Sequence, residues 1–311
     1  MQSAITINRS IYLLFVIALS LAIYSISDQI HDLKFPTDLN YKYLFIAILG
    51  QILFWVTSCF TWRQSLNIFT GHRLSFVLSF IHSNIVTIGK YLPGKIWGLV
   101  SRGIDLKQRG INNKETFLVS YLDQALLLHA GIAIGSFSLA LSKSLALAVI
   151  IFILCVLSVL LVSKGHDILT KVTIKFTNNF DLTKLKSNLT TRNYSILMIY
   201  YMAAWLVSGL MFASIYFAFF GFDSRLLLPL IGASSIGIIA GFIAVFAPGG
   251  LGVREAASAG ILIEFIPAEE AIFLVLICRL WTVLTDITGG ILAFGLHHTH
   301  KEKFLADNPR N

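Results

Sequence analysis

The chain has 311 residues, of which 56% are hydrophobic and 13% are charged, and its mean hydropathy is +0.77. Soluble domains carry about 25% charged residues, so this composition excludes an ordinary soluble enzyme and indicates an all-α polytopic membrane protein. The formal net charge of +8 fits basic loops on one side of a membrane better than nucleic-acid binding, because no basic stretch is interleaved with aromatic residues.

Apolar segments follow one another along the whole chain, and six of them are long and unbroken enough to predict spanning helices. In chain order they are 11–27, 43–60, 116–140, 145–163, 194–220 and 271–296. We interpret the first as an uncleaved helix and not as a signal peptide, since no convincing small-x-small cleavage site precedes Asp28.

Two further apolar segments, 74–100 and 226–266, are interrupted by proline and glycine. Proline removes a backbone donor and glycine permits a reversal, so each segment is predicted to enter the membrane and return as a re-entrant hairpin. Backbone without partners survives at membrane depth only when it is buried in protein or lines a wet cavity. The predicted hairpin tips contain Pro93, Gly94, Pro248, Gly249, Gly250 and Gly252.

The distribution of basic residues predicts the orientation. With six spans and two hairpins, 16 of the 24 lysines and arginines lie in cytoplasmic segments, against 4 in the outer loops. The positive-inside rule therefore predicts a multi-pass protein of the bacterial inner membrane with both termini in the cytoplasm. The cytoplasmic segments are 1–10, 61–74, 101–115, 164–193 and the tail 297–311.

In this topology the hairpins enter from opposite sides, which predicts an inverted repeat of 43–140 and 194–296 within a single membrane domain. Two Gly-x-x-x-Gly motifs offer small helix faces that allow another helix to approach closely, although glycine is also common in membrane helices in general. They are Gly131 with Gly135, and Gly237 with Gly241. An ungapped offset of 155 residues supports a duplication, because it aligns Pro93 with Pro248, Gly94 with Gly249, Glu115 with Glu270, and Gly135 with Gly290.

Charged residues inside the apolar segments are the candidates for a site. Arg254 and Glu255 lie beside the second break, where the following helix turns its positive N-terminus toward the gap. Two interpretations stay open: an ion pair that only fixes helix packing, and a site for a lipid head group or an ion. The candidate residues for substrate binding and translocation are Arg254, Glu255, Arg279, Asp286, Lys90, Lys95 and Asp123.

Other motifs point away from catalysis. Gly89–Ile96 nearly matches a phosphate loop, but Ile96 lacks the hydroxyl that binds magnesium and Pro93 removes an amide. We find no nucleophile motif and no metal motif, so we expect no cofactor, no metal and no enzyme activity. His82 and His129 are predicted to be core histidines with satisfied hydrogen bonds.

The stretch Phe246–Glu255, followed by a helix with Arg279 and Asp286, resembles the flippase-like membrane domain of bacterial lysylphosphatidylglycerol synthases. The earlier stretch Lys90–Lys95 is similar to the first-half motif of that family, and the likeness covers about residues 10–296. The chain departs from the family at Tyr121-Leu122-Asp123-Gln124, where members usually have a Glu–Arg pair before the aspartate.

The resemblance implies transport of a lipid between leaflets and not lipid synthesis, since we expect no soluble synthase domain in this chain. The implied cargo is a membrane lipid that is anionic, aminoacylated or a polyprenyl phosphate. The alternative function is a membrane component, or a partner, of a lipid-linked glycosyltransferase or phosphoryl-transferase system. The sequence favours transport, because the longest outer loop, Asp28 to Lys42, is short for a catalytic domain.

Overall fold

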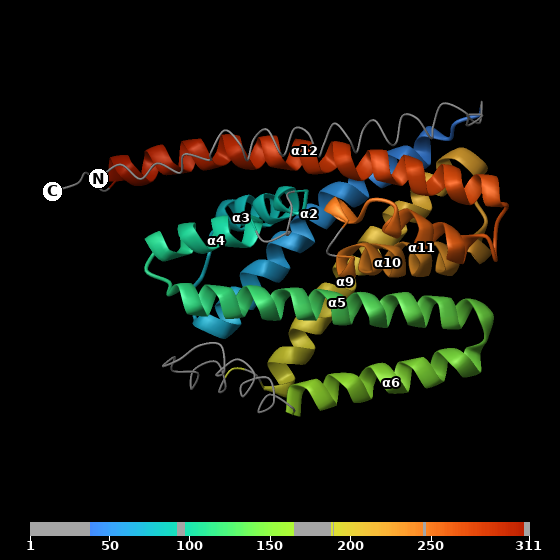
Figure 1. Cartoon of the computed structure of the whole chain (residues 1–311), viewed down its shortest axis with the longest axis horizontal. Coiled ribbons are helices and arrows are strands. Elements are labelled where there is room, and N and C mark those ends of the chain that lie inside the picture. Colours follow the sequence, from blue (N-terminus) through green and yellow to red (C-terminus); the bar gives the residue numbers. More distant parts are fainter. Residues whose placement is uncertain (1–37, 92–96, 165–187, 189, 245–246, 308–311) are drawn as a thin grey trace.

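A computed structural model of the chain describes residues 38–91, 97–164, 188, 190–244 and 247–307 (Figure 1). The regular elements in this part of the chain are helical, as the sequence predicts. They are α2 (Tyr41–Thr70), α3 (Phe76–Gly89), α4 (Trp97–Gln108), α5 (Asn113–Lys143), α6 (Leu145–Lys164), α9 (Thr191–Phe220), η1 (Ser224–Leu226), α10 (Leu227–Ile243), η2 (Pro248–Gly250), α11 (Val253–Leu262) and α12 (Ala268–Asp307).

Six helices in the described part are long and apolar enough to cross a membrane. Five of them confirm predicted spans: Tyr41–Thr70, Glu115–Lys143, Leu145–Val162, Thr191–Phe220 and Ala268–His297. The sixth, Ser224–Ile243, falls in the segment that was predicted as one arm of a hairpin. The predicted span 11–27 lies outside the described residues, so the number six is reached with a different set of helices.

Helices extend into three segments that the sequence predicts as cytoplasmic. The segment 61–74 is mostly helical because α2 continues to Thr70, and the segment 101–115 contains the second half of α4. The tail, predicted to begin at 297, continues α12 to Asp307. The physical reason in α2 is a buried face with helical spacing, formed by Trp62, Ser65, Leu66 and Phe69.

Local signals in the sequence fix where several helices begin and end. The side-chain oxygens of Asn40, Ser75 and Thr190 accept hydrogen bonds from backbone N–H groups in the first turns of α2, α3 and α9. The helix α2 ends at Gly71, whose φ of +78° suits a residue without a Cβ atom. These caps fix where α2, α3 and α9 begin and where α2 ends.

Two pairs of shorter helices, α3 with α4 and α10 with α11, are packed against each other in antiparallel fashion (Figure 1). Glycines allow the close approach of each pair: a Cβ atom on Gly98 would collide with Val86 on α3, and one on Gly237 would collide with Ser258 on α11. The direction of the chain is therefore reversed between α3 and α4 and between α10 and α11, and the sequence predicts a break between the helices of each pair.

The long helices pack across the two halves of the chain (Figure 1). Helix α2 lies along α9, α5 packs on α10, and α12 packs on α3. Gly135 on α5 faces Ile236 on α10, and Gly290 on α12 faces Ile88 on α3, so both crossings place a glycine against an isoleucine. A long helix from the first half of the chain thus packs on the α10–α11 pair, and a long helix from the second half packs on the α3–α4 pair.

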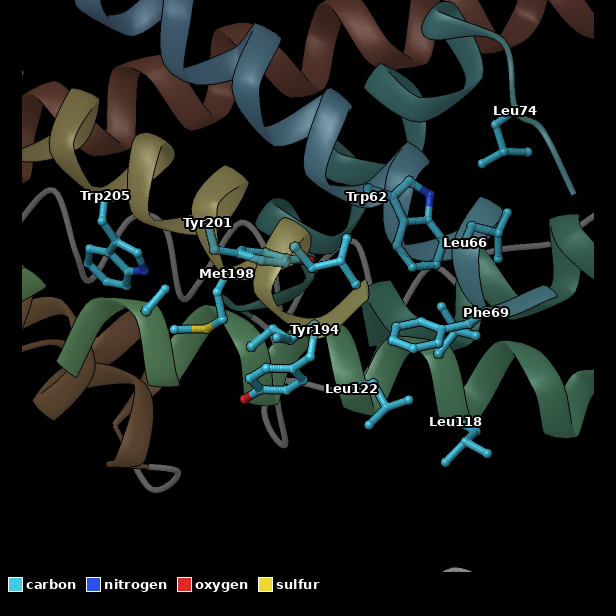
Figure 2. Packing of buried hydrophobic residues seen from close by; sticks show 14 of the residues in the cluster. Trp62, Leu66, Phe69, Leu74, Leu118, Leu122, Tyr194, Met198, Tyr201 and Trp205 are labelled. Carbon is cyan, nitrogen blue, oxygen red and sulfur yellow. The ribbon is translucent and has the colours of Figure 1, made fainter. Parts of the chain in front are cut away.

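A buried core of aromatic and aliphatic side chains joins α2, α5 and α9 (Figure 2). Polar tips in this core find partners: Trp205 Nε1 on α9 donates to the carbonyl of Leu127 on α5 at 2.8 Å. The two shorter helix pairs pack against these three helices, through α3 on α2 and through α10 on α5 and α9. The labelled core residues are Trp62, Leu66, Phe69, Leu74, Leu118, Leu122, Tyr194, Met198, Tyr201 and Trp205.

Candidate functional site

Three glycines shape the break between α10 and α11. Gly249, Gly250 and Gly252 have φ angles of +59°, +75° and +78°, a region that L side chains rarely adopt. A Cβ atom on Gly249 would also lie 2.9 Å from Arg279 Nη2 and 3.0 Å from the ring of Tyr91. Glycine is therefore required at position 249 both for the backbone conformation and for the space between these two side chains.

The backbone of the second break is hydrogen bonded to the backbone of the residue that directly follows α3, where the first break begins. The backbone N–H of Gly249 donates to the carbonyl of Lys90 at 3.1 Å. On its other side, the carbonyl of Gly249 accepts a hydrogen bond from Arg279 Nη1 at 2.8 Å. Residues Pro93, Gly94 and Lys95 lie outside the described part of the chain.

Around this junction lies a group of ionisable side chains, which we name the tip cluster: Lys90, Tyr91, Arg254, Glu255, Arg279 and Asp286. Asp286 on α12 binds two members from the other half of the chain. Lys90 Nζ lies 2.6 Å from Asp286 Oδ2, and the hydroxyl of Tyr91 donates to the same oxygen at 2.6 Å. Five of the seven predicted site residues are thus brought together, and the sequence placed them on three separate segments.

Several polar atoms of the tip cluster are buried without a hydrogen-bond partner. Arg279 is 1% exposed, and its Nε lies 3.6 Å from Glu255 Oε1, too far for a hydrogen bond. Arg279 Nε and Nη2 and both carboxylate oxygens of Glu255 have no partner in the part of the chain that the structure describes. Native proteins rarely leave such groups unsatisfied, so this spacing suits a water molecule or a ligand.

Arg254 is half-buried and lies close enough to Arg279 and Glu255 to interact with their charges. Within the described residues its guanidinium has neither an ion pair nor a hydrogen bond. The cluster holds three cations, Lys90, Arg254 and Arg279, against two carboxylates, Glu255 and Asp286. Its formal net charge is therefore +1, which favours an anionic ligand.

Asp123 lies apart from the tip cluster, in a second group that we name the Asp123 cluster: Trp62, Ser65, Arg102, Asp123, Gln124 and Tyr201. The hydroxyl of Tyr201 donates to Asp123 Oδ1, and Arg102 Nη1 lies 3.6 Å from Asp123 Oδ2. The guanidinium of Arg102 also stacks on the ring of Trp62, with 3.6 Å between its Cζ atom and the ring centroid. One arginine and one carboxylate make this group electrically neutral.

Both predicted core histidines have partners on both ring nitrogens. His82 Nδ1 accepts from Trp62 Nε1 at 3.3 Å, so its Nε2 carries the proton and donates to Asp105 Oδ2 at 2.9 Å. Burial by itself would raise the pKa of the Asp105 carboxyl, but hydrogen bonds from His82 and Arg109 bring that pKa below its ordinary value. The ring of His129 is hydrogen bonded to Tyr194 and Ser158, so the structural interpretation is confirmed for both histidines.

Sequence reasoning missed three residues of these clusters. Arg102 was counted among loop charges, yet it is 2% exposed on α4. Tyr91 and Tyr201 were not considered as hydrogen-bond donors, yet each donates a hydrogen bond to a buried carboxylate. Neither tyrosine shares a helix with the aspartate that it binds, so the available signal was only general: a buried carboxylate needs hydrogen-bond donors, and these can come from another helix.

The apolar helices define an integral membrane protein with six candidate spans in its described part. The chain matches the family described as "Lysylphosphatidylglycerol synthase TM region" over residues 4–290, which is nearly its whole length. The protein is therefore a multi-pass membrane protein that belongs to this family, and the resemblance seen at Phe246–Glu255 is confirmed. A comparison with curated proteins gave no match.

Proposed function

We propose that the protein moves a lipid between the two leaflets of the membrane, with the head group held at the tip cluster. The observation that carries this proposal is a group of charges with a formal net charge of +1, in which Arg279 has buried donors without a hydrogen-bond partner and the half-buried Arg254 has no ion pair among the described residues. Arginine binds phosphate oxygens with its planar fork, so these donors suit the phosphate of a lipid head group. The lipid tails would stay in the surrounding bilayer.

The barrier to such movement is the removal of a charged head group from water. A charge at the bilayer centre costs from about 3 to over 10 kcal/mol, depending on the reference state, unless it is paired or hydrated. The tip cluster supplies opposite charges and hydrogen-bond donors at the place where the chain is broken, as broken helices do in transporters. Electrostatic compensation alone lowers this barrier, and no covalent chemistry is required.

We also propose that the fold is an inverted repeat with two re-entrant hairpins. Helix α3 has 14 residues and is about 21 Å long at 1.5 Å per residue, which is short of the roughly 30 Å of a hydrocarbon core. The reciprocal packing of α5 on α10 and α12 on α3, with Gly135 and Gly290 at matching crossings, supports the duplication. The offset between these glycines is the same 155 residues that aligns the two breaks.

The basic residues support an orientation with both termini in the cytoplasm of a bacterial inner membrane. In this proposal the protein is a transporter and not an enzyme. Its cargo is an anionic, aminoacylated or polyprenyl-phosphate lipid, and its functional partner is an enzyme that makes or uses that lipid, such as a lipid-modifying enzyme or a glycosyltransferase.

The test is leaflet exchange in vesicles that contain the purified protein. Labelled phosphatidylglycerol, an aminoacyl phosphatidylglycerol and a polyprenyl phosphate are compared for wild type, Arg254→Gln and the control Arg225→Gln, which changes an exposed arginine paired with Asp223. We expect wild type and the control to speed exchange of at least one lipid. Loss of a charge-assisted contact should slow the Arg254→Gln variant by about tenfold or more.

Two results would contradict parts of the proposal. If wild-type vesicles exchange none of the three lipids faster than protein-free vesicles, lipid movement is wrong. If Arg254→Gln exchanges lipid as fast as wild type, the tip cluster is not where the head group binds.

A further inference from the structure

A second polar site lies at the end of α2 and shares no residue with the tip cluster. It is a cavity of about 270 Å³ lined by Arg63, Gln64, Asn67 and Arg73, which we name the α2-end pocket. The first three residues come from neighbouring positions on the last turns of α2, and the left-handed Gly71 turns the chain so that Arg73 closes the pocket.

The side chains that line the α2-end pocket are not used elsewhere in the fold. In the part of the chain that the structure describes, none of the four makes a side-chain hydrogen bond or an ion pair. Arg63 is half-buried on α2, whereas Arg73 is exposed. Two positive charges and two amides therefore converge on one cavity, and no carboxylate of the described residues forms an ion pair with either arginine.

The length of α2 indicates that the pocket lies at the level of a membrane surface. Helix α2 has 30 residues and is about 45 Å long, whereas the hydrocarbon core is about 30 Å thick, so its ends reach the head-group layers. Its first turn is fixed to the end of α9 by a hydrogen bond from the Asn40 N–H to the Ala218 carbonyl. The α2-end pocket is therefore at the opposite end of the bundle from the loop that follows α9.

We propose that the α2-end pocket binds the phosphate of an anionic phospholipid as a resident lipid at the membrane surface. Arginine pairs bind phosphate oxygens in a bidentate way, and the amides of Gln64 and Asn67 add uncharged donors. Basic pockets beside membrane helices bind anionic head groups, which the membrane itself presents at high local concentration. This inference rests on insertion in the membrane and is independent of the proposed lipid movement.

The experiment counts lipids retained by the purified full-length protein in native mass spectrometry. The probes are short-chain phosphatidylglycerol, phosphatidylcholine of equal chain length, and inorganic phosphate. The variant Arg63→Gln/Arg73→Gln is compared with Lys107→Gln/Arg192→Gln, which removes the same charge from exposed positions at the same end of the bundle. Arg73→Gln alone lies beyond the helix end and tests the site without any change in α2.

We expect wild type and the control pair to retain one more phosphatidylglycerol than the Arg63→Gln/Arg73→Gln variant, with about tenfold weaker binding in the variant. Arg73→Gln should show a smaller loss, and phosphatidylcholine should not compete. Equal retention by wild type and the double variant would overturn the proposal. Inorganic phosphate that displaces phosphatidylglycerol at equal concentration would also overturn it, because the site would then belong to a soluble phosphate. A tip-cluster variant such as Arg254→Gln should keep the extra lipid, which separates this result from any failure of lipid exchange.

Discussion

The tip cluster and the Asp123 cluster are built from the same kinds of residue but differ in charge and in access. In each, an aspartate on a long helix accepts a hydrogen bond from a tyrosine of the other half of the chain and lies near a cation: Asp286 with Tyr91 and Lys90, and Asp123 with Tyr201 and Arg102. The comparison shows that an Asp–Tyr–cation arrangement does not by itself define a ligand site.

The two clusters differ in the solvent exposure of their side chains and in the balance of their charges. Arg102 is 2% exposed and stacks on Trp62, and its charge is balanced by Asp123. In the tip cluster the side chain of Lys90 is 32% exposed, and Arg254 adds a charge that no carboxylate balances. Buried donors without a hydrogen-bond partner occur in both clusters, on Arg102 and on Arg279, so the clusters differ in net charge and exposure: the Asp123 cluster is neutral and closed, whereas the tip cluster has a net charge of +1 and a partly exposed lysine.

The largest effect on stability should come from breaking the closed cluster. Arg102→Met leaves Asp123 buried without its cation, and we expect a loss of about 3–5 kcal/mol in the free energy of unfolding. Unfolding in detergent by denaturant measures it, with exposed Lys107→Gln as the control. The double variant Arg102→Met/Asp123→Leu should recover much of the loss. A small effect of Arg102→Met would mean that the two clusters are not distinguished by burial.

Removing a tyrosine hydroxyl should also cost more free energy of unfolding in the Asp123 cluster than in the tip cluster, although both losses should be smaller than that of Arg102→Met. Tyr201→Phe removes a hydrogen bond to a sealed carboxylate, and we expect a loss of about 1.5–3 kcal/mol. Tyr91→Phe should lose less, because Lys90 still binds Asp286 Oδ2. Paired unfolding curves check the order of the two variants. The reverse order would contradict the assignment of the Asp123 cluster as the more closed of the two.

Gly249→Ala tests the backbone that positions the tip cluster. A Cβ atom at this left-handed position would meet Arg279 and Tyr91, and we expect a loss of about 1–3 kcal/mol together with slower lipid exchange. Gly260→Ala on α11 is the matched control, since its Cβ atom has no neighbour within 4 Å. Stability should stay the same or rise in that control. Equal behaviour of the two variants would show that the junction is not tightly packed.

The smallest effect on stability is expected for Arg254→Gln. Its guanidinium has no partner among the described residues, so its removal should change the free energy of unfolding by less than about 0.5 kcal/mol. Lipid exchange should nevertheless fall, as proposed above. Thermal unfolding and exchange are measured on the same preparation. A large loss of stability would mean that Arg254 has a structural role like that of Arg102.

The sequence predicted much of this molecule where its signals are local. Apolar length predicted five of the observed spans, and proline with glycine predicted both chain reversals. Charge within apolar segments predicted Arg254, Glu255, Arg279, Asp286 and Lys90, which the fold brings together.

The sequence could not predict the contacts between segments that are distant along the chain. Asp123 was placed in the candidate site, but only the fold reveals that Arg102 and Tyr201 lie against it. Arg102 sits among other basic residues, so hydropathy assigned it to a loop, and nothing local indicates the ring of Trp62 on which it stacks. No arginine lies beside Asp123 in the sequence, and the guanidinium near this carboxylate comes from α4.

The hydrogen bond from the Gly249 amide to the Lys90 carbonyl involves only main-chain atoms. This bond does not depend on the identity of either side chain, provided that residue 249 stays free of a Cβ atom. In the proposed transport, substitutions at positions such as 90 and 254 would therefore alter the preference for one head group while the main-chain contact between the two halves is kept. Directed evolution at these positions, with the backbone unchanged, is the natural route to altered lipid preference.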